Sequence, residues 1–142
     1  MDKMRNLYKE VILKLNKSPI GFKTNPGAQY VIEAYNPVCG DQYKIYFDLK
    51  DDIISNFSYH GYGCAISKAS GSIMMKLMQS RKIDEALDLY ILFESVISGK
   101  HNLDFPEDFQ AFTSVQQHPG RIKCVTLVWD EMATALNSFK KS

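Results

Sequence analysis

The feature that most constrains the fold is a change of hydrophobic period at Gly63. Every second residue between 43 and 49 is large and apolar, a pattern typical of a strand with one buried face. Residues 53–62 follow a similar pattern and residues 50–52 form a turn, so the two segments are predicted to pair as an antiparallel hairpin. From 64 to about 80 the apolar residues recur at helical spacing, which predicts a helix directly after the hairpin.

Further elements are predicted on both sides of this hairpin. The chain is expected to begin with an amphipathic helix over residues 3–16, followed by a short strand from Gln29 to Tyr35. Three more helices are predicted: one from Asp84, as its N-cap, to about Ser98, a short one within residues 106–115, and one that begins between Pro119 and Cys124 and ends near Phe139. This order predicts a single α+β domain over residues 1–142, with helices covering one face of a small antiparallel sheet.

Composition argues against several classes of function. Lys and Arg total 17 and Asp and Glu total 16, so the net charge of +1 favours neither a nucleic-acid surface nor a polybasic membrane patch. The longest apolar runs, such as residues 90–93, are too short to span a membrane. Residues 1–6 are charged and lead into no apolar segment, which argues against a secretory signal. The cytoplasm is therefore the expected compartment, and neither nucleic acid nor membrane is an expected partner.

The chain has three cysteines, Cys39, Cys64 and Cys124. An odd number of cysteines makes a poor disulfide framework. One interpretation is that all three are buried thiols that fill the core, because free cysteine is among the most buried residue types. Each of the three lies, however, at a turn or at the end of a predicted element, where reactive residues are often placed. This placement favours a chemical role.

A carboxylate accompanies the first cysteine. Asp41 follows Cys39 by two residues, so their side chains point to the same side of an extended chain, and Gly40 between them permits a tight backbone. Cys64 and Cys124 each lie near the start of a predicted helix, where exposed N–H groups favour a thiolate. If the hairpin brings these elements together, three sulfurs and one carboxylate oxygen meet, a set that suits tetrahedral Zn²⁺. The same sulfurs also suit an iron–sulfur cluster, and their spacing does not decide between the two.

Basic residues near the third cysteine bear on the charge of this candidate site. Three thiolates and a carboxylate carry more negative charge than Zn²⁺ neutralises. Arg121 and Lys123 lie close to Cys124 in the sequence and are expected to offset the surplus. Arg121 in particular is predicted to be a charge partner for Asp41 or for a cysteine.

Histidines and serines are weaker candidates for chemistry. None of His60, His101 and His118 is assigned to the metal. A hydrolase with Cys64 as its nucleophile is a further interpretation, but no recognisable motif places a histidine beside it. Ser67 and Ser70 lack the surrounding glycines of a nucleophile elbow and are interpreted as helix-packing residues.

Each cysteine belongs to a longer motif. The three segments are Asn36-Pro37-Val38-Cys39-Gly40-Asp41, Gly61-Tyr62-Gly63-Cys64-Ala65-Ile66-Ser67-Lys68-Ala69-Ser70 followed by Met74-Met75, and Arg121-Ile122-Lys123-Cys124-Val125-Thr126-Leu127-Val128-Trp129. In this order they resemble the three cysteine motifs of the U-type iron–sulfur cluster assembly proteins, the family of IscU, SufU and the NifU N-terminal domain. The resemblance covers roughly residues 36–136, most of the chain.

Within that family the chain is more similar to the SufU branch. Lys123 precedes Cys124 where IscU-type proteins carry a ligand histidine, and the stretch between the second and third cysteines is long. The resemblance implies four zinc ligands, which are Cys39, Asp41, Cys64 and Cys124. It also implies that Cys39 accepts persulfide sulfur from a pyridoxal-phosphate-dependent cysteine desulfurase of the SufS type, which makes the chain an accessory sulfurtransferase that serves downstream iron–sulfur scaffold proteins. The alternative is an iron–sulfur scaffold that assembles a cluster and transfers it.

Overall fold

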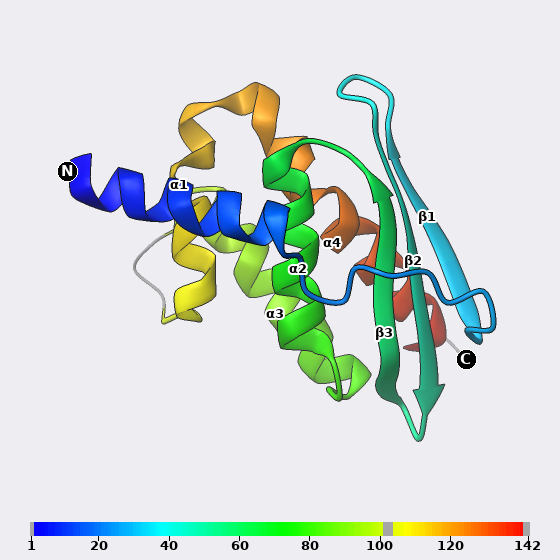
Figure 1. Ribbon diagram of the computed structural model, residues 1–142. Coiled ribbons are helices and arrows are strands. Elements are labelled where there is room, and N and C mark those ends of the chain that lie inside the picture. The colour runs from blue at the N-terminus through cyan, green and yellow to red at the C-terminus, as the bar shows by residue number, and fades with distance from the viewer. Residues whose placement is uncertain (1, 101–103, 141–142) are drawn as a thin grey trace.

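The computed structural model describes residues 2–100 and 104–140, with side chains from residue 8 onward. The elements in chain order are α1 (Asp2–Lys17), β1 (Tyr30–Asn36), β2 (Asp41–Lys50), β3 (Ile53–Tyr62), α2 (Ala65–Met78), α3 (Ile83–Ile97), the 3₁₀ helix η1 (Glu107–Gln117) and α4 (Pro119–Lys140). Figure 1 shows the sheet on one side of the molecule and the helices gathered on the other. The predicted order of elements is confirmed.

The three strands form one antiparallel sheet in the order β1-β2-β3. The turn between β2 and β3 contains Asp51 and Asp52, whose φ angles of 54° and 63° suit the right-handed twist of a tight hairpin. The predicted hairpin is therefore confirmed. The predicted first strand is confirmed within one residue, and its last residue, Asn36, lies opposite Asp41. This pairing places Asp41 at one end of the sheet.

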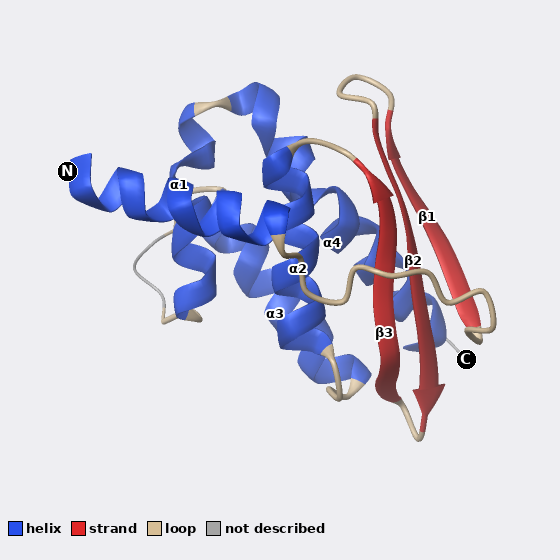
Figure 2. Cartoon of the chain, viewed as in Figure 1, coloured by secondary structure: helices blue, strands red, loops and turns tan. Residues whose placement is uncertain are grey.

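The helices cover one face of the sheet, as the sequence predicts (Figure 2). The strand residues Ile45, Phe47 and Tyr59 are completely buried. In the helical layer, Trp129 of α4 stacks on Phe93 of α3 with ring centroids 4.2 Å apart. Among the described residues, no helix combines the length and apolar character needed to cross a bilayer. The fold is thus α+β with its core between the sheet and the helices.

Helix α2 approaches its neighbours closely because one face carries small residues. The hydroxyl of Ser70 donates to the carbonyl of Val125 at 2.5 Å, and the indole N–H of Trp129 donates to the carbonyl of Ser70 at 3.2 Å. These two bonds join α2 to the first half of α4. They fix the position of Cys124, which lies next to Val125, relative to the start of α2.

Gly71 is the tightest point of this packing. A Cβ atom at Gly71 would lie 2.6 Å from the Tyr59 ring, whereas one at Gly120, in the first turn of α4, would meet nothing within 4 Å. The variants Gly71→Ala and Gly120→Ala each replace a helical glycine by alanine, but only Gly71→Ala overpacks the core. We expect Gly71→Ala to be less stable than Gly120→Ala by about 1–3 kcal/mol in urea denaturation. Equal unfolding midpoints would contradict this packing.

The start of α3 differs from the sequence prediction. The N-cap is Lys82, not Asp84, and the helix begins two residues earlier than predicted. The reason is that Glu85 accepts a hydrogen bond from the Lys82 backbone N–H at 2.9 Å, while Ile83 is buried and its N–H donates to the carbonyl of Asp52. Asp84 instead pairs with Lys140 at 3.0 Å on the surface.

Candidate metal centre

Three of the four predicted ligands come together at one end of the sheet. Cys39 lies in the connection between β1 and β2, Asp41 is the first residue of β2, and Cys124 lies near the start of α4. One ligand atom from each of these residues lies within 4.8 Å of the other two. The Sγ atoms of Cys39 and Cys124 are 3.0 Å apart. In Figure 1 the β1–β2 connection and the start of α2 lie at the same end of the molecule.

The connection that carries Cys39 is short and closed at its base. The N–H of Gly40 donates to the carbonyl of Asn36 at 2.8 Å, and the N–H of Val38 donates to Asn36 Oδ1 at 3.2 Å. Gly40 has a φ of 74°, a conformation that L side chains rarely adopt. Val38 at the tip is 91% exposed, and Cys39 is also exposed. The first cysteine is therefore presented to solvent on a tight turn.

Asp41 is the buried member of the group. Its side chain is completely buried, and its Oδ1 accepts a hydrogen bond from the Cys64 backbone N–H at 3.0 Å. Its Oδ2 is buried too, without a hydrogen-bond partner among the described residues. A buried carboxylate oxygen that lacks a partner is costly, and a cation held with the neighbouring sulfurs satisfies it. The residues present therefore fit a thiophilic divalent metal such as Zn²⁺.

Cys64 lies beside this group without belonging to it. It is half-buried and is the N-cap of α2, which agrees with its predicted place at a helix start. Its side chain makes no capping hydrogen bond. Its sulfur is not among the three ligand atoms that lie within 4.8 Å of one another, but its N–H is bonded to Asp41. Cys64, the fourth predicted ligand, therefore lies beside the group, and its role as a ligand stays a prediction.

The surroundings of Cys124 oppose the ionisation of its thiol. Burial raises the pKa of the Cys124 thiol well above its ordinary value, and the hydrogen bond with Cys39 and the charges of Cys64 and Asp41 raise it further. Metal binding to Cys124 must therefore displace a proton.

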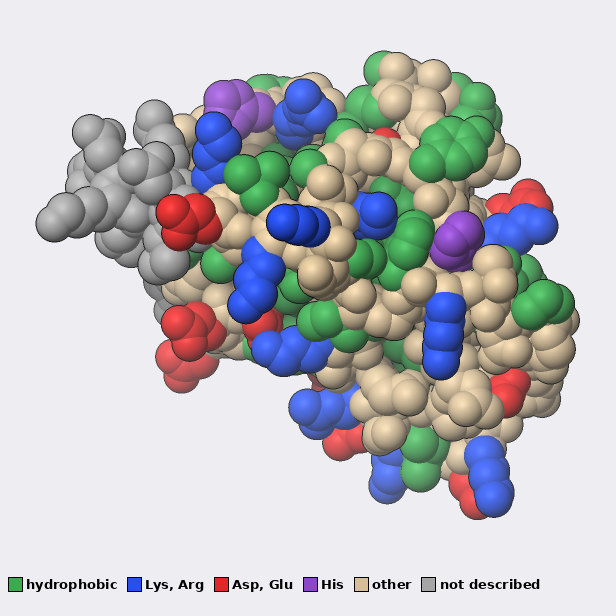
Figure 3. All heavy atoms as spheres, viewed as in Figure 1, with side chains coloured by type: hydrophobic (Ala, Val, Ile, Leu, Met, Phe, Trp, Pro, Cys, Tyr) green, Lys and Arg blue, Asp and Glu red, His purple; other side chains and the backbone are tan. Residues whose placement is uncertain are grey.

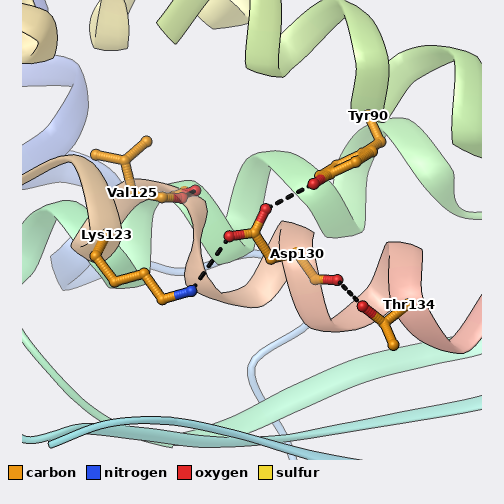
Figure 4. Close-up of polar contacts among 6 residues, drawn as sticks. Tyr90, Lys123, Val125, Asp130 and Thr134 are labelled. Atoms are coloured by element: carbon orange, nitrogen blue, oxygen red, sulfur yellow. Dashed lines mark hydrogen bonds and ion pairs between the residues drawn. The ribbon is translucent and has the colours of Figure 1, made fainter. Parts of the chain in front are cut away.

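Neither of the two basic residues expected to offset the charge of the site forms an ion pair with Asp41 in the described part of the chain. Lys123 pairs with one carboxylate oxygen of Asp130 at 3.3 Å, and Tyr90 donates a hydrogen bond to the other at 2.7 Å (Figure 4). Arg121 is exposed and makes no ion pair with any described residue. Its role as a charge partner for Asp41 or a cysteine stays a prediction.

No histidine of the described part of the chain joins the group. His60 packs against the ring of Phe22, with centroids 4.6 Å apart, and His118 ends η1. His101 lies outside the described residues. The hydrolase interpretation therefore gains no support, since it needs a histidine beside Cys64.

Two residues of this region were missed by sequence reasoning as parts of the site. The hydroxyl of Tyr43 lies 2.7 Å from Ser67 Oγ, and the Ser67 hydroxyl donates to the carbonyl of Cys64 at 2.9 Å. Burial raises the pKa of Tyr43 above its ordinary value, so its hydroxyl keeps its proton at neutral pH. The sequence identifies Tyr43 as an inward-facing strand residue and Ser67 as a packing residue. No pattern in the sequence indicates that the two meet.

Comparison with known proteins gives consistent results. The family model described as the NifU-like N-terminal domain matches residues 7–142. The chain is 34% identical over 128 residues to the zinc-dependent sulfurtransferase SufU of Bacillus subtilis, with 87% of this chain and 84% of that protein covered. It is 30% identical over 138 residues to the iron–sulfur cluster assembly scaffold protein IscU of Streptococcus pyogenes, with 96% and 86% covered.

A solved structure has the same fold. It is a crystal structure described as a putative iron–sulfur cluster assembly scaffold protein for the SUF system, from Fervidobacterium islandicum. The TM-score is 0.80 at 30% sequence identity, and the alignment covers 89% of this chain and 94% of that chain. The family match extends over nearly the whole sequence and includes all three cysteine motifs. The chain therefore belongs to the NifU-like N-terminal domain family.

Proposed function

We propose that this chain is a zinc-dependent sulfur acceptor for iron–sulfur cluster assembly, which takes persulfide sulfur from a pyridoxal-phosphate-dependent cysteine desulfurase of the SufS type. The observation that carries the proposal is the convergence of Cys39, Asp41 and Cys124, with a buried oxygen of Asp41 that has no partner among the described residues. The relative from Bacillus subtilis, which is named a zinc-dependent sulfurtransferase, supports it. The proposed ligands are Cys39, Asp41, Cys64 and Cys124.

The burial of each ligand suggests a division of roles. Asp41 and Cys124 are buried and are suited to hold a metal permanently, whereas Cys39 is exposed and accessible to a partner. Bound zinc supplies a redox-inert positive charge that keeps cysteines as thiolates at neutral pH. Cys39 is therefore the residue that we assign as the sulfur acceptor.

The sulfur transfer is a thiolate exchange. The Cys39 thiolate attacks the outer sulfur of a persulfide on the desulfurase. A sulfur–sulfur bond forms on Cys39, the sulfur–sulfur bond on the desulfurase breaks, and the electron pair leaves with the desulfurase thiolate. The exchange needs no external oxidant or reductant. The sulfur on Cys39 is then available to a downstream iron–sulfur scaffold.

A second candidate is the scaffold function itself, in which the same residues hold an iron–sulfur cluster that is later transferred. The 30% identity to a protein named as an IscU scaffold favours it. Thiolates are the normal ligands of such clusters, and Asp41 would supply the remaining ligand atom.

Metal analysis combined with a desulfurase assay separates the two functions. For the sulfur acceptor we expect about one zinc per chain, no visible absorption, and faster desulfuration of cysteine when the protein is added to a SufS-type desulfurase. The protein with its metal removed by a chelator should not stimulate the desulfurase until zinc is returned. A brown protein that passes a cluster to an apo-acceptor, and that leaves the desulfurase rate unchanged, would support the scaffold function instead.

A further inference from the structure

Tyr43 lies in the core next to the candidate metal centre, and the proposed function does not use it. Its side chain is 1% exposed, and its hydroxyl lies 2.7 Å from Ser67 Oγ on α2. The single hydroxyl proton of Ser67 is donated to the carbonyl of Cys64. Ser67 can therefore only accept from Tyr43, so the chain of donation runs from Tyr43 through Ser67 to Cys64.

Both backbone polar groups of Cys64 are connected by hydrogen bonds to side chains of β2. The N–H is connected directly to Asp41, and the carbonyl is connected to Tyr43 through Ser67. The N–H of Cys64 donates directly to Asp41 Oδ1 at 3.0 Å. The carbonyl accepts from Ser67 at 2.9 Å and from the Lys68 backbone N–H at 3.1 Å, and Ser67 is in turn bonded to Tyr43. Asp41 and Tyr43 are two residues apart on β2, so their side chains leave the strand on the same side. The strand thereby orients the N–H of Cys64 directly, and through Ser67 it reinforces the helical hydrogen bond that Lys68 makes to the Cys64 carbonyl.

The glycine before Cys64 makes this arrangement possible. A Cβ atom at Gly63 would lie 2.5 Å from the Tyr43 hydroxyl oxygen, 2.6 Å from Asp41 Oδ1 and 2.6 Å from Ser67 Oγ. Three polar atoms from two different elements therefore converge on the α-carbon of Gly63. A side chain at position 63 would therefore collide with the atoms that make these hydrogen bonds, while the thiol of Cys64 itself has no capping role.

We propose that Tyr43 is a positioning residue for the fourth metal ligand, Cys64. Through Ser67, its hydroxyl fixes the turn at residues 63–64 so that rotation of the Cys64 side chain alone brings the sulfur to the group formed by Cys39, Asp41 and Cys124. This inference rests on the proposed function to the extent that the site must hold a metal. Hydrogen bonds that orient metal ligands commonly change metal affinity by about 10–100-fold.

The same helix provides a matched control. Tyr59 on β3 is also completely buried, and its hydroxyl lies 2.9 Å from Ser72 Oγ on α2. It also donates to the carbonyl of Lys68, and none of these partners is a proposed ligand. Tyr43→Phe and Tyr59→Phe therefore remove the same group from the same kind of buried tyrosine–serine pair. Only Tyr43→Phe interrupts a chain that ends at a cysteine.

The test is metal binding by the full chain. Zinc affinity is measured by competition with a chromophoric chelator, and the Co²⁺-substituted protein is examined by visible and near-ultraviolet absorption. We expect Tyr43→Phe to weaken zinc binding by about 10-fold or more and to reduce the sulfur-to-cobalt charge-transfer absorption, because Cys64 is bound less fully. Tyr59→Phe should match the wild type in both measurements. In the metal-free state Tyr59→Phe should lose at least as much thermal stability as Tyr43→Phe, because the Tyr59 hydroxyl makes two buried hydrogen bonds and the Tyr43 hydroxyl makes one.

A second substitution keeps the test decisive if Tyr43→Phe does not fold. Ser67→Ala interrupts the same chain of hydrogen bonds from Tyr43 to Cys64, so it should also weaken zinc binding and reduce the charge-transfer absorption. Because both substitutions break one chain, the Tyr43→Phe, Ser67→Ala double variant should bind zinc about as well as each single variant. Wild-type affinity and spectrum in Tyr43→Phe or in Ser67→Ala would overturn the positioning role alone. A wild-type protein that binds neither zinc nor Co²⁺ would overturn the positioning role and the proposed function together. Normal metal binding without stimulation of the desulfurase would overturn only the proposed function.

Discussion

Cys39→Ala is expected to abolish the transfer of sulfur to this chain. After the protein is mixed with a cysteine desulfurase and cysteine, the wild type should carry one additional sulfur atom on Cys39, detected by mass spectrometry of alkylated peptides. The variant should carry none, and the desulfurase rate should fall to that of the desulfurase alone. The physical reason is that Cys39 is the exposed thiol of the group, whereas Cys124 is 1% exposed. A persulfide needs an accessible thiolate for its attack.

Cys64→Ala is the matched comparison for this experiment. It also removes one thiol and one proposed ligand, but it leaves the acceptor in place. We therefore expect weaker zinc binding in Cys64→Ala, with sulfur still detectable on Cys39. Circular dichroism of the Cys39→Ala protein should be unchanged, because an exposed side chain contributes little to the core. Appearance of the extra sulfur on Cys124 in the Cys39→Ala protein would refute the assignment.

When the metal is removed, Cys39 and Cys124 are expected to become easily oxidised to a disulfide. Their sulfurs are 3.0 Å apart, and a disulfide needs about 2.05 Å, so a small movement of the exposed Cys39 closes the bond. A diazene oxidant such as diamide takes up the two protons and two electrons that the thiols lose. We expect the chelator-treated protein to form this disulfide almost completely, while Cys64 remains open to alkylation. The zinc-loaded protein should resist the same treatment.

Peptide mapping under non-reducing conditions checks this expectation. Cys64→Ser should form the disulfide as readily as the wild type, whereas Cys39→Ser should not form it at all. A disulfide between Cys64 and either of the other cysteines would show that the ligand group is arranged differently from the structure. Equal oxidation with and without zinc would argue that the thiols do not hold the metal.

The regular elements of the fold were predictable because local patterns determine them. Alternating residues around Phe47 predicted the hairpin, and the change of period at Gly63 predicted α2. The start of α3 was placed two residues too late because Asp84 is a common N-cap type. What decides the helix start is the burial of Ile83 and its bond to the β2–β3 turn, and these are tertiary contacts.

The candidate site was predictable as a set of residue types but not as an arrangement. The spacing of Cys39 and Asp41 indicated that they act together, and the structure places their ligand atoms close to each other. The offset of Cys64 from the group, and the commitment of Lys123 to Asp130, depend on how α2 and α4 dock on the sheet. The bond between Tyr43 and Ser67 joins residues 24 apart and arises from the same docking. No single-sequence periodicity contains that information.

The closed base of the β1–β2 connection limits how far the sulfur can travel. Residues 37–40 are tethered at both ends by paired strands, and Cys39 is only two residues from Asp41, a stretch that spans about 7 Å when it is fully extended. The thiol can therefore swing, but it cannot be carried deep into another molecule. Under the proposed function, a protein that donates or receives the sulfur would therefore have to bring its own reactive atom to the β1–β2 connection, on a loop long enough to cover the remaining gap.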